Sequence, residues 1–496
     1  MVVFFMAFSK TMYRQIKRCR KYLWLDTHRR DLRPDAQKPA PDDTVVSLAK
    51  AFFGPYTDAA VVTDGVRDLR ATVERTKECM EQGIDVICGA AFAWEGLSCT
   101  VDILRREEGG YAIYMLKVAS NYGAEEGADH AYQLYVLEQC GIRVTGVRVL
   151  TLCKEYVRGE TLELSKLFRV HDRTELVRRE LETFEDKMAE AESVLAGPEP
   201  VCDIGSHCFG SVRCPYWPHC SAHLPKPSVF DVYNIRDKKW TLYQEGRTAL
   251  KDIPDELKLS PVQKIQVRYG DGDRGVFVDK EGVRDFLSTL FYPMHFFDFE
   301  SMQPPVPPYP GTRPYTQIPF QYSLHYIDGP GGELKHEEFL DTSGNDPRRA
   351  IAERICRDIP TNACVIAYHM SYEEGRLKEL AALFPDLAGH LLALVKNLRD
   401  LEVPFKEGAY YHPAMGGSFS IKSVLPALFP DDPDLDYHRL EGVHNGNEVK
   451  TIFPKIRDMS PQEQERIRGS LLAYCKLDTL AMVKVWQKLC EAVEET

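Results

Sequence analysis

Two carboxylates one residue apart are the first feature of this sequence that could do chemistry. The stretch His295–Glu300 has the pattern of a strand and carries Asp298 and Glu300. Side chains alternate along a strand, so both carboxylates should face one side while Phe297 and Phe299 face the core. Carboxylates held this close repel each other unless a cation lies between them, so the pair predicts a divalent-metal site.

Three further acidic positions could join this pair. Tyr474 and Asp478 lie near the end of the chain, and their i, i+4 spacing puts them on the same face of a predicted helix. Glu373 belongs to the segment 369–373, which follows a predicted strand and opens a helix. Asp400 follows a predicted helix and is either another ligand or the cap of the helix exit.

The order of these segments resembles the DEDD exonucleases of the ribonuclease H-like fold, in the subclass with tyrosine in the third motif. The resemblance implies two divalent ions, Mg²⁺ or Mn²⁺, one activating water and the other steadying the leaving oxygen. It implies metal binding by Asp298, Glu300 and Asp478, a ligand set completed by Glu373, and an attacking water oriented by Tyr474. The family usually has Asn and Asp in its middle motif, where this chain has His369 and Glu373.

Two glycine- and aromatic-rich stretches lie between the middle and third motifs. They are Tyr410–His412 and Gly416–Lys422, the second directly before a predicted helix. Aromatic rings, backbone amides and a lysine could contact bases and phosphates. An ordinary turn would use the same glycines, and the sequence leaves both interpretations open.

A second acid and lysine pattern lies in the N-terminal half. Asp102 is predicted to end one strand and Lys117 the next, and the helix that follows carries Asp129, Gln133 and Tyr135. This pattern resembles the RecB-like nucleases of the PD-(D/E)xK fold. Their motif pairs Asp with Glu-x-Lys and adds a Gln-x-x-x-Tyr-type helix. The resemblance implies that the acids bind a metal and that the lysine polarises the water.

The N-terminal pattern is damaged at two positions. Met115 occupies the place of the second acid, and Gly89 lies where the family often carries another. A thioether is a poor ligand for Mg²⁺, which prefers hard oxygens. We therefore expect Asp102, Lys117 and Gln133 to form a degenerate site in a domain that binds nucleic acid without cutting it. The alternative is a plain α/β domain with one buried lysine.

Cysteines cluster at one place only. Cys208, Cys214 and Cys220 are spaced for a soft metal or an iron–sulfur cluster, and a fourth ligand is missing. RecB-like nucleases of the iron–sulfur type take that ligand from the far N-terminal helix, where this chain has Cys19. The resemblance thus implies a [4Fe–4S] cluster. Cys202 in place of Cys19 would instead give a contiguous zinc site.

Length and charge limit the remaining possibilities. The chain has 496 residues, too long for one hydrophobic core. Its net charge of −12 argues against coating of nucleic acid by the whole surface, but the first 30 residues hold eight Lys or Arg against one acid, Asp26. This patch predicts nucleic-acid contact, with a solvated helix face as the alternative. Fourteen cysteines, mostly scattered, fit a reducing cytoplasm, and no stretch is apolar enough to span a membrane.

Helical and strand patterns alternate in both halves, which predicts α/β domains. We expect a RecB-like module with the cysteine cluster over 1–225, a connector over 226–290 and an exonuclease domain over 291–496. A basic helix should run over Ser9–Leu25. A terminal helix should open at Ser460 and run toward Val493, with Gly469 as a place where it could break.

Taken together, the two modules resemble a bacterial family that fuses a RecB-like nuclease module to a ribonuclease H-like one. The segments Tyr309–Tyr315 and Gln317–Gln321 carry that resemblance. The expected function is a divalent-metal-dependent 3′→5′ exonuclease acting on single-stranded nucleic-acid ends. The alternative is a nucleic-acid binding or sensing protein whose catalytic sites have decayed. The sequence does not identify protein partners.

Overall fold

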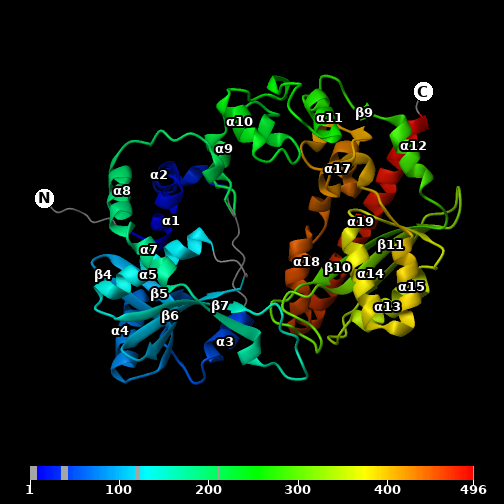
Figure 1. Ribbon diagram of the computed structural model, residues 1–496. Helices are drawn as coiled ribbons and strands as arrows, with labels where there is room; N and C mark the ends of the chain where they lie inside the picture. Colours follow the sequence, from blue (N-terminus) through cyan, green and yellow to red (C-terminus); the bar gives the residue numbers. More distant parts are fainter. Residues whose placement is uncertain (1–7, 35–42, 119–122, 211, 495–496) are drawn as a thin grey trace. The chain divides into compact units, whose positions relative to one another are not determined.

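The chain forms two compact units, each mixing helices and strands (Figure 1). The computed structural model describes residues 8–34, 43–118, 123–210 and 212–494. Unit 1 comprises Met1–His223 with Pro304–Thr316, and unit 2 comprises Leu224–Gln303 with Gln317–Thr496. The segment 226–290, expected as a connector, therefore groups with unit 2, and the proline-rich loop inside the C-terminal half groups with unit 1.

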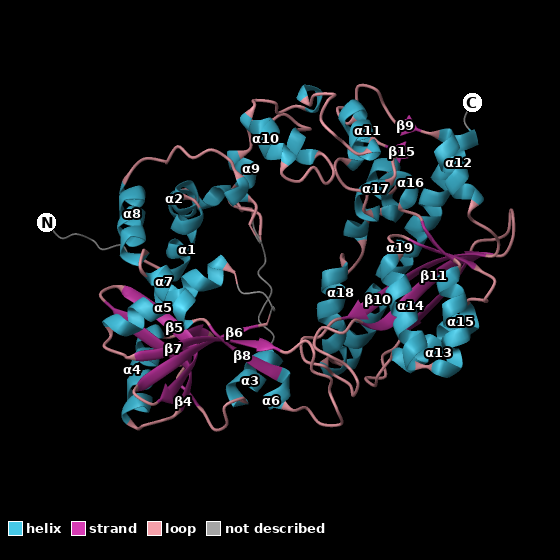
Figure 2. Cartoon of the chain, viewed as in Figure 1, coloured by secondary structure: helices cyan, strands magenta, loops and turns pink. Residues whose placement is uncertain are grey.

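Unit 1 is built on a six-stranded mixed sheet (Figure 2). Its strands in spatial order are β1 (Thr57–Asp58), β4 (Val86–Trp94), β5 (Leu97–Glu107), β6 (Gly110–Lys117), β7 (Val144–Leu152) and β8 (Phe168–Asp172). Neighbours are antiparallel except for β1 with β4 and β6 with β7. Lys117 ends β6 as expected, whereas Asp102 lies within β5 because that strand continues past it to Glu107.

Helices supply the rest of the two cores of unit 1. They are α1 (Lys10–Arg18), α2 (Arg20–His28), α3 (Asp43–Ala51), α4 (Leu69–Glu81), α5 (Ala124–Gln139), α6 (Leu164–Leu167), α7 (Thr174–Leu181), α8 (Phe184–Ala196) and α9 (Trp217–Cys220). Apolar side chains of α1, α4, α5, α7 and α8 pack with the sheet into the larger core. Those of α3 and α6 pack into the second core, which also contains Tyr114 and Leu150.

The basic N-terminal helix differs from the expectation. Ser9 caps it as predicted, its Oγ accepting a 3.2 Å hydrogen bond from the amide of Met12. The helix does not run on to Leu25, because Cys19 adopts an extended backbone with φ −168° and ψ 128°. The stretch is therefore two short helices, α1 and α2, with Cys19 between them.

Residues 304–316 follow strand β10 (Met294–Met302) of unit 2 in the sequence but belong to unit 1. We call these residues the strap. The Nη1 atom of Arg158 donates hydrogen bonds to the carbonyl oxygens of Pro307 (2.8 Å) and Pro308 (2.9 Å). Val306 and Tyr315 of the strap pack against the second core. The strap is thus an integral part of unit 1.

Unit 2 is built on a five-stranded sheet with β10 at its centre. The strands in spatial order are β12 (Lys335–Leu340), β11 (Ile318–Ile327), β10 (Met294–Met302), β13 (Cys364–Ala367) and β14 (Leu398–Asp400). The first three are antiparallel, while β13 and β14 run parallel to β10. Asp298 and Glu300 therefore lie on the central strand, with Phe297 and Phe299 in the core as expected.

Helices cover both faces of this sheet (Figure 1). The helices of unit 2 are α10 (Lys238–Gln244), α11 (Pro261–Tyr269), α12 (Lys280–Ser288), α13 (Arg348–Asp358), α14 (Ser371–Leu383), α15 (Pro385–Lys396), α16 (Val403–Lys406), α17 (Ile421–Leu428), α18 (Gly446–Ile452) and α19 (Pro461–Glu494). The core that contains Phe297 lies between the sheet and α13–α15. Helix α19 packs on β10 and β11 and passes through Gly469 without a break. None of the described helices is long and apolar enough to cross a membrane.

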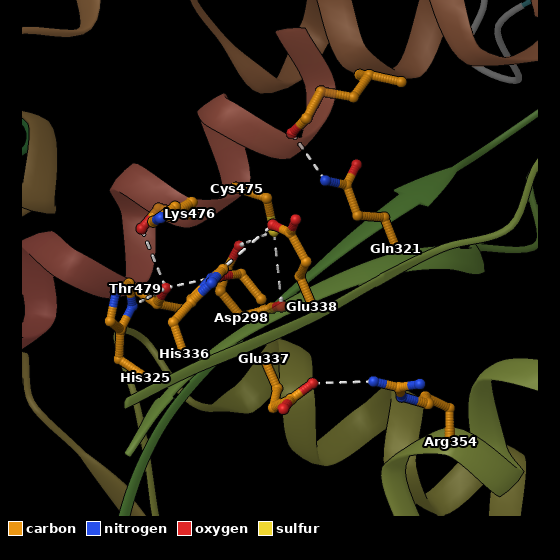
Figure 3. Close-up of polar contacts among 12 residues, drawn as sticks. Asp298, Gln321, His325, His336, Glu337, Glu338, Arg354, Cys475, Lys476 and Thr479 are labelled. Atoms are coloured by element: carbon orange, nitrogen blue, oxygen red, sulfur yellow. Dashed lines mark hydrogen bonds and ion pairs between the residues drawn. The ribbon is translucent and has the colours of Figure 1, made fainter. Parts of the chain in front are cut away.

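Buried polar contacts hold α19 in register on the sheet (Figure 3). The Nε2 atom of Gln321 on β11 donates a 2.7 Å hydrogen bond to the carbonyl oxygen of Leu471. Ser323 Oγ and His325 Nδ1 hydrogen-bond Thr479 Oγ1 at 2.7 and 2.8 Å. Burial lowers the pKa of His325 to about 3, so this contact buries no charge. Because Thr479 follows Asp478, these contacts also fix where the terminal acid lies.

Candidate functional site

Three carboxylates meet beside the central strand of unit 2. The ligand oxygens of Asp298, Glu300 and Asp478 all lie within 4.8 Å of one another. The first two come from β10 and the third from α19, so the docking of that helix creates the acid cluster. Cys475, on the same helix, places its Sγ 3.8 Å from Asp298 Oδ2 (Figure 3). The structure thus brings together the three acids that the sequence assigned to the metals.

Burial raises the pKa of every acid in this cluster, and repulsion by neighbouring acids adds to the shift for Asp298 and Glu300. Burial, reinforced by Asp478, raises the pKa of Glu300 to about 8. Burial raises the pKa of Asp478 to about 6, and it raises that of Asp298 well above its ordinary range, with Asp478 adding to the shift. Such acids hold protons that a divalent cation could replace. Hard oxygens converging in this number fit Mg²⁺ or Mn²⁺.

Glu373 lies close to the cluster without being one of its three converging members. It opens α14 as expected, is 2 % exposed, and its charge raises the pKa of Asp298 and Glu300. Burial, reinforced by Asp400, raises the pKa of Glu373 itself to about 8. Among the described residues its Oε2 has no hydrogen-bond partner. A buried carboxylate oxygen without a partner suits a fourth ligand position.

Asp400 shapes the loop beside the site. It ends β14 and does not follow a helix, because α15 stops at Lys396. Its Oδ1 accepts hydrogen bonds from the amides of His369 (2.9 Å) and Glu402 (3.0 Å). His369 has a left-handed backbone with φ 64°, and its Nδ1 lies 2.9 Å from Glu402 Oε2. Asp400 therefore accepts two backbone amides beside the site and does not cap the exit of a helix, while its charge acts on Glu373.

Tyr474 and Asp478 have partners that the motif does not contain. Tyr437 donates a 2.6 Å hydrogen bond to Asp478 Oδ1. Lys422 Nζ donates a 2.9 Å hydrogen bond to the Tyr474 hydroxyl. Burial, reinforced by Asp478, raises the pKa of Tyr474 far above its ordinary value, so the phenol keeps its proton. Lys422 was a candidate for nucleic-acid contact, whereas Tyr437 carries no signal in the sequence because it lies in an irregular segment.

A cavity of about 520 Å³ opens beside the acid cluster. Its lining includes Tyr233, Asp298, Glu300, Tyr368, His369, Glu402, Phe419, Tyr474, Asp478 and Met482, together with Gly417, Ser418, Ser420 and Ile421. Tyr233 comes from the segment expected as a connector, and its ring centroid lies 4.8 Å from that of Phe419. The buried side chains of Gln263 and Gln266 hydrogen-bond the backbone of Tyr233. The cavity therefore has an aromatic wall next to its acidic wall.

The two glycine- and aromatic-rich stretches have different roles, one at the cavity and one in the fold. Residues 417–421 line the cavity, as a nucleic-acid contact would require. Tyr410 and Tyr411 are buried, and they form strand β15, which pairs with β9 (Phe277–Val278). They are therefore structural and do not line the cavity.

The acid and lysine pattern of unit 1 is held by internal contacts. Asp102 accepts a 2.8 Å hydrogen bond from the amide of Leu116, and Gln133 donates one of 2.7 Å to the carbonyl oxygen of Thr100. Lys117 is paired with Glu126, an acid from α5. Within the described part of the chain, no group of three metal ligands includes any of these residues. This arrangement agrees with a degenerate site.

The basic N-terminal stretch is largely neutralised inside unit 1. Lys10 and Arg14 pair with Asp129 at 3.2 Å each. Further ion pairs join Lys17 to Glu180, Arg20 to Glu190 and Lys21 to Glu199. Arg18 donates to three backbone carbonyls, including that of Val212 at 2.7 Å. The stretch is thus neither an unpaired basic patch nor a merely solvated face. Its ion pairs and hydrogen bonds join α1 and α2 to the C-terminal part of the unit.

Five cysteines line one small cavity in unit 1. They are Cys19, Cys202, Cys208, Cys214 and Cys220. The sulfur atoms of Cys19 and Cys202 lie 3.5 Å apart, and both are grouped with His207 in a possible metal site. Burial raises the pKa of Cys220 to about 11, so its thiol is neutral unless a metal is bound. The donors fit a thiolate-bound metal or cluster. The structure gathers Cys202 as well as Cys19, which the sequence treated as alternatives.

Comparisons with known proteins add little about function. Residues 295–420 match a domain of unknown function (DUF2779). The chain is 27% identical over 296 residues to an uncharacterized protein, UU173, of Ureaplasma parvum serovar 3. That alignment covers 54% of this chain and 41% of the relative, so the chain spans about two fifths of the relative's length. No solved structure matches the chain.

Proposed function

We propose that unit 2 is a divalent-metal-dependent 3′→5′ exonuclease acting on single-stranded nucleic acid. The observation that carries the proposal is the convergence of Asp298, Glu300 and Asp478 at the edge of a cavity that also contains Tyr474. The mixed sheet, with its acids on the central strand and an acidic helix across it, supports the resemblance to ribonuclease H-like nucleases.

Each residue of the site has its own role in the proposed reaction. The three converging acids, with Glu373 beside them, would hold two Mg²⁺ or Mn²⁺ ions, which supply an activated water and a stabilised leaving oxygen when bound. Tyr474 keeps its proton and can therefore hydrogen-bond the attacking water without becoming charged. Tyr437 donates to Oδ1 of Asp478, and Tyr474 is a second hydrogen-bond partner of the same carboxylate, so both tyrosines orient this acid.

The cavity favours an unpaired strand end as substrate. About 520 Å³ is the volume of a small-ligand pocket, which suits a single terminal nucleotide. Aromatic side chains bind unstacked bases of any sequence, and Tyr233, packed against the buried ring of Phe419, provides such a ring. The choice between DNA and RNA is left to experiment.

For unit 1 we propose nucleic-acid binding without cleavage, on a scaffold held by a thiolate-bound cluster. Lys117 is paired with Glu126, and Met115 replaces the second acid, so the group that would polarise water is engaged elsewhere. The cavity of about 500 Å³ lined by Arg14, Lys17, Arg18 and Lys117 also contains Glu125 and Glu126. Because its cations are already engaged inside unit 1, the proposal of nucleic-acid binding rests on the resemblance to RecB-like nucleases. Lys117→Ala should leave cleavage of any substrate unchanged, and an endonuclease activity lost in this variant would contradict the proposal.

The deciding experiment follows 5′-labelled DNA and RNA oligonucleotides of matched sequence with Mg²⁺ or Mn²⁺. We expect stepwise shortening from the 3′ end. Asp298→Asn should lower the rate by at least about 10³-fold, equivalent to about 4 kcal/mol of transition-state stabilisation, while the protein stays folded. Asp273→Asn, an exposed acid of unit 2 outside the cluster, is the control. Binding without any shortening would favour the alternative of a decayed binding protein.

A further inference from the structure

One cation lies inside the acidic site of unit 2 without belonging to any of the acidic motifs. Lys422 is the second residue of α17, and its Nζ donates a 2.9 Å hydrogen bond to the hydroxyl of Tyr474. The same nitrogen lies 5.2 Å from the ring centroids of both Tyr474 and Tyr437. Its charge also acts on Glu300 and Asp478, lowering the pKa of each against the effect of burial.

The backbone around Lys422 is anchored on both sides. Ser420 caps α17, its Oγ accepting a 3.3 Å hydrogen bond from the amide of Lys422. The hydroxyl of Tyr368 donates a 2.6 Å hydrogen bond to the carbonyl oxygen of Phe419. The lysine stem is thus held at its base, and its ammonium is held between two aromatic rings. A long, flexible side chain fixed in this way can position its neighbour.

The consequence for Tyr474 concerns the direction of its proton. A phenolic oxygen that accepts from a lysine must point its own O–H elsewhere. Asp478 is a hydrogen-bond partner of that phenol. Without the lysine, the hydroxyl could take either of its two orientations in the plane of the ring. With it, the proton is directed to the side where the acids and the cavity lie.

We propose that Lys422 is a positioning residue that holds the Tyr474 hydroxyl toward the acid cluster. This inference rests on the proposed exonuclease function for its kinetic consequence, but the contact itself can be tested without activity. Lys422 acts through the tyrosine and does not itself bind a metal.

The activity-independent test uses protein labelled with ¹³C at the tyrosine ζ carbon, whose NMR signal reports the hydrogen bonds of the phenol. Tyr474→Phe identifies the Tyr474 signal by its loss. Lys422→Met should shift that signal, and Lys450→Met should not. Lys450 is the matched control, because its charge also acts on Glu300 but no contact joins it to Tyr474 among the described residues. An unmoved Tyr474 signal in Lys422→Met would overturn the proposal even if the protein is a nuclease.

The kinetic test is a double-mutant cycle on 3′-end hydrolysis. Lys422→Met and Tyr474→Phe should each lower kcat by about tenfold or more, with KM changed less than about twofold. The double variant should be no slower than Tyr474→Phe alone, because the lysine then has nothing to position. Lys422→Arg should recover part of the rate.

Two outcomes of the cycle would overturn the inference. Equal losses from Lys422→Met in both backgrounds would show that the lysine acts without the tyrosine. A rise in KM with unchanged kcat would show that it contacts the substrate phosphate instead. If the unaltered protein hydrolyses nothing, the proposed function fails, while the NMR result still decides whether Lys422 positions Tyr474.

Discussion

Tyr437 donates a 2.6 Å hydrogen bond to Asp478, although 41 residues separate them and the tyrosine donor lies in a 3-10 helix of only three residues, Tyr437–Arg439. This contact lowers the pKa of Asp478, against the larger effect of burial, which raises it. The acid at the centre of the proposed metal site is therefore oriented by a residue that belongs to no recognised motif.

Tyr437→Phe should weaken metal binding, because Asp478 loses the donor that favours its charged form. A hydrogen bond to a carboxylate contributes about 1.5–3 kcal/mol, so Mn²⁺ affinity should fall by about tenfold or more at neutral pH. Isothermal titration calorimetry would measure this change. Tyr411→Phe is the control, since its hydroxyl donates only a 3.4 Å bond to a backbone carbonyl. Equal affinities for all three proteins would contradict the assigned role.

Metal binding should become more stabilising as the pH rises. Folding raises the pKa of Glu300 from 4.5 to about 8 and that of Asp478 from 3.8 to about 6 in the metal-free protein. The folded state then binds more protons than the unfolded state, so metal-free stability is lost as pH rises through these folded-state values. A divalent cation replaces those protons and removes the loss.

Thermal unfolding with and without Mn²⁺ between about pH 5 and about pH 8.5 would measure this coupling. We expect the metal-induced rise in Tm to be small at the acid end and largest above about pH 8, the folded-state pKa of Glu300. Glu300→Gln should flatten the pH dependence of the metal-free protein. A metal effect that is the same at every pH would show that these acids are not the ligands.

The aromatic wall should make the proposed exonuclease sensitive to the terminal base. Stacking contributes about 1–3 kcal/mol per base, so Tyr233→Ala or Phe419→Ala should raise KM for a single-stranded 3′ end by about tenfold. An oligonucleotide with an abasic 3′-terminal residue should bind the unaltered protein as weakly as the normal end binds these variants. Tyr56→Ala, an exposed tyrosine in unit 1, is the control. If abasic and normal ends are shortened alike by the unaltered protein, the wall does not hold the base.

The metal bound by the five thiols that line the cysteine cavity of unit 1 should distinguish an iron–sulfur cluster from a zinc site. Anaerobically purified protein should absorb broadly near about 400 nm and contain about four irons per chain. Cys19→Ser should bleach it and destabilise unit 1, because the cluster would join α1–α2 to the distant segment 202–220. Cys79→Ser is the control, since that buried thiol lies in the apolar core. A colourless protein with one zinc, lost in Cys202→Ser but kept in Cys19→Ser, would show the contiguous site instead.

The orientation of the acids within each element was predictable because regular elements fix the direction of side chains. The convergence of Asp478 with Asp298 and Glu300 was expected only from the resemblance, because it depends on the docking of α19. Alternation on a strand put Asp298 and Glu300 on one face, and helical spacing put Tyr474 beside Asp478. Neither inference needed the tertiary structure. The sequence could not provide Tyr437 or Tyr233, because both lie in irregular segments whose paths depend on distant contacts.

The basic N-terminal stretch shows that a local count of charges does not reveal whether those charges are paired in the fold. Its positive residues looked available because their partners lie far along the chain, as Glu180 does from Lys17. Only the folded structure brings these acids to the helices. The break at Cys19 was equally hidden, since the apolar pattern continues across it and favours a single helix.

The strap has a consequence for how the protein is made. Unit 1 includes residues 304–316, so its fold is not complete when His223 leaves the ribosome. By the time Tyr315 can reach the second core, β10 with Asp298 and Glu300 has already emerged. In the nascent chain, the position of the strap in unit 1 therefore stays unfilled while β10 of unit 2 is synthesised. Unit 1 therefore cannot complete its fold during translation before the synthesis of unit 2 has begun.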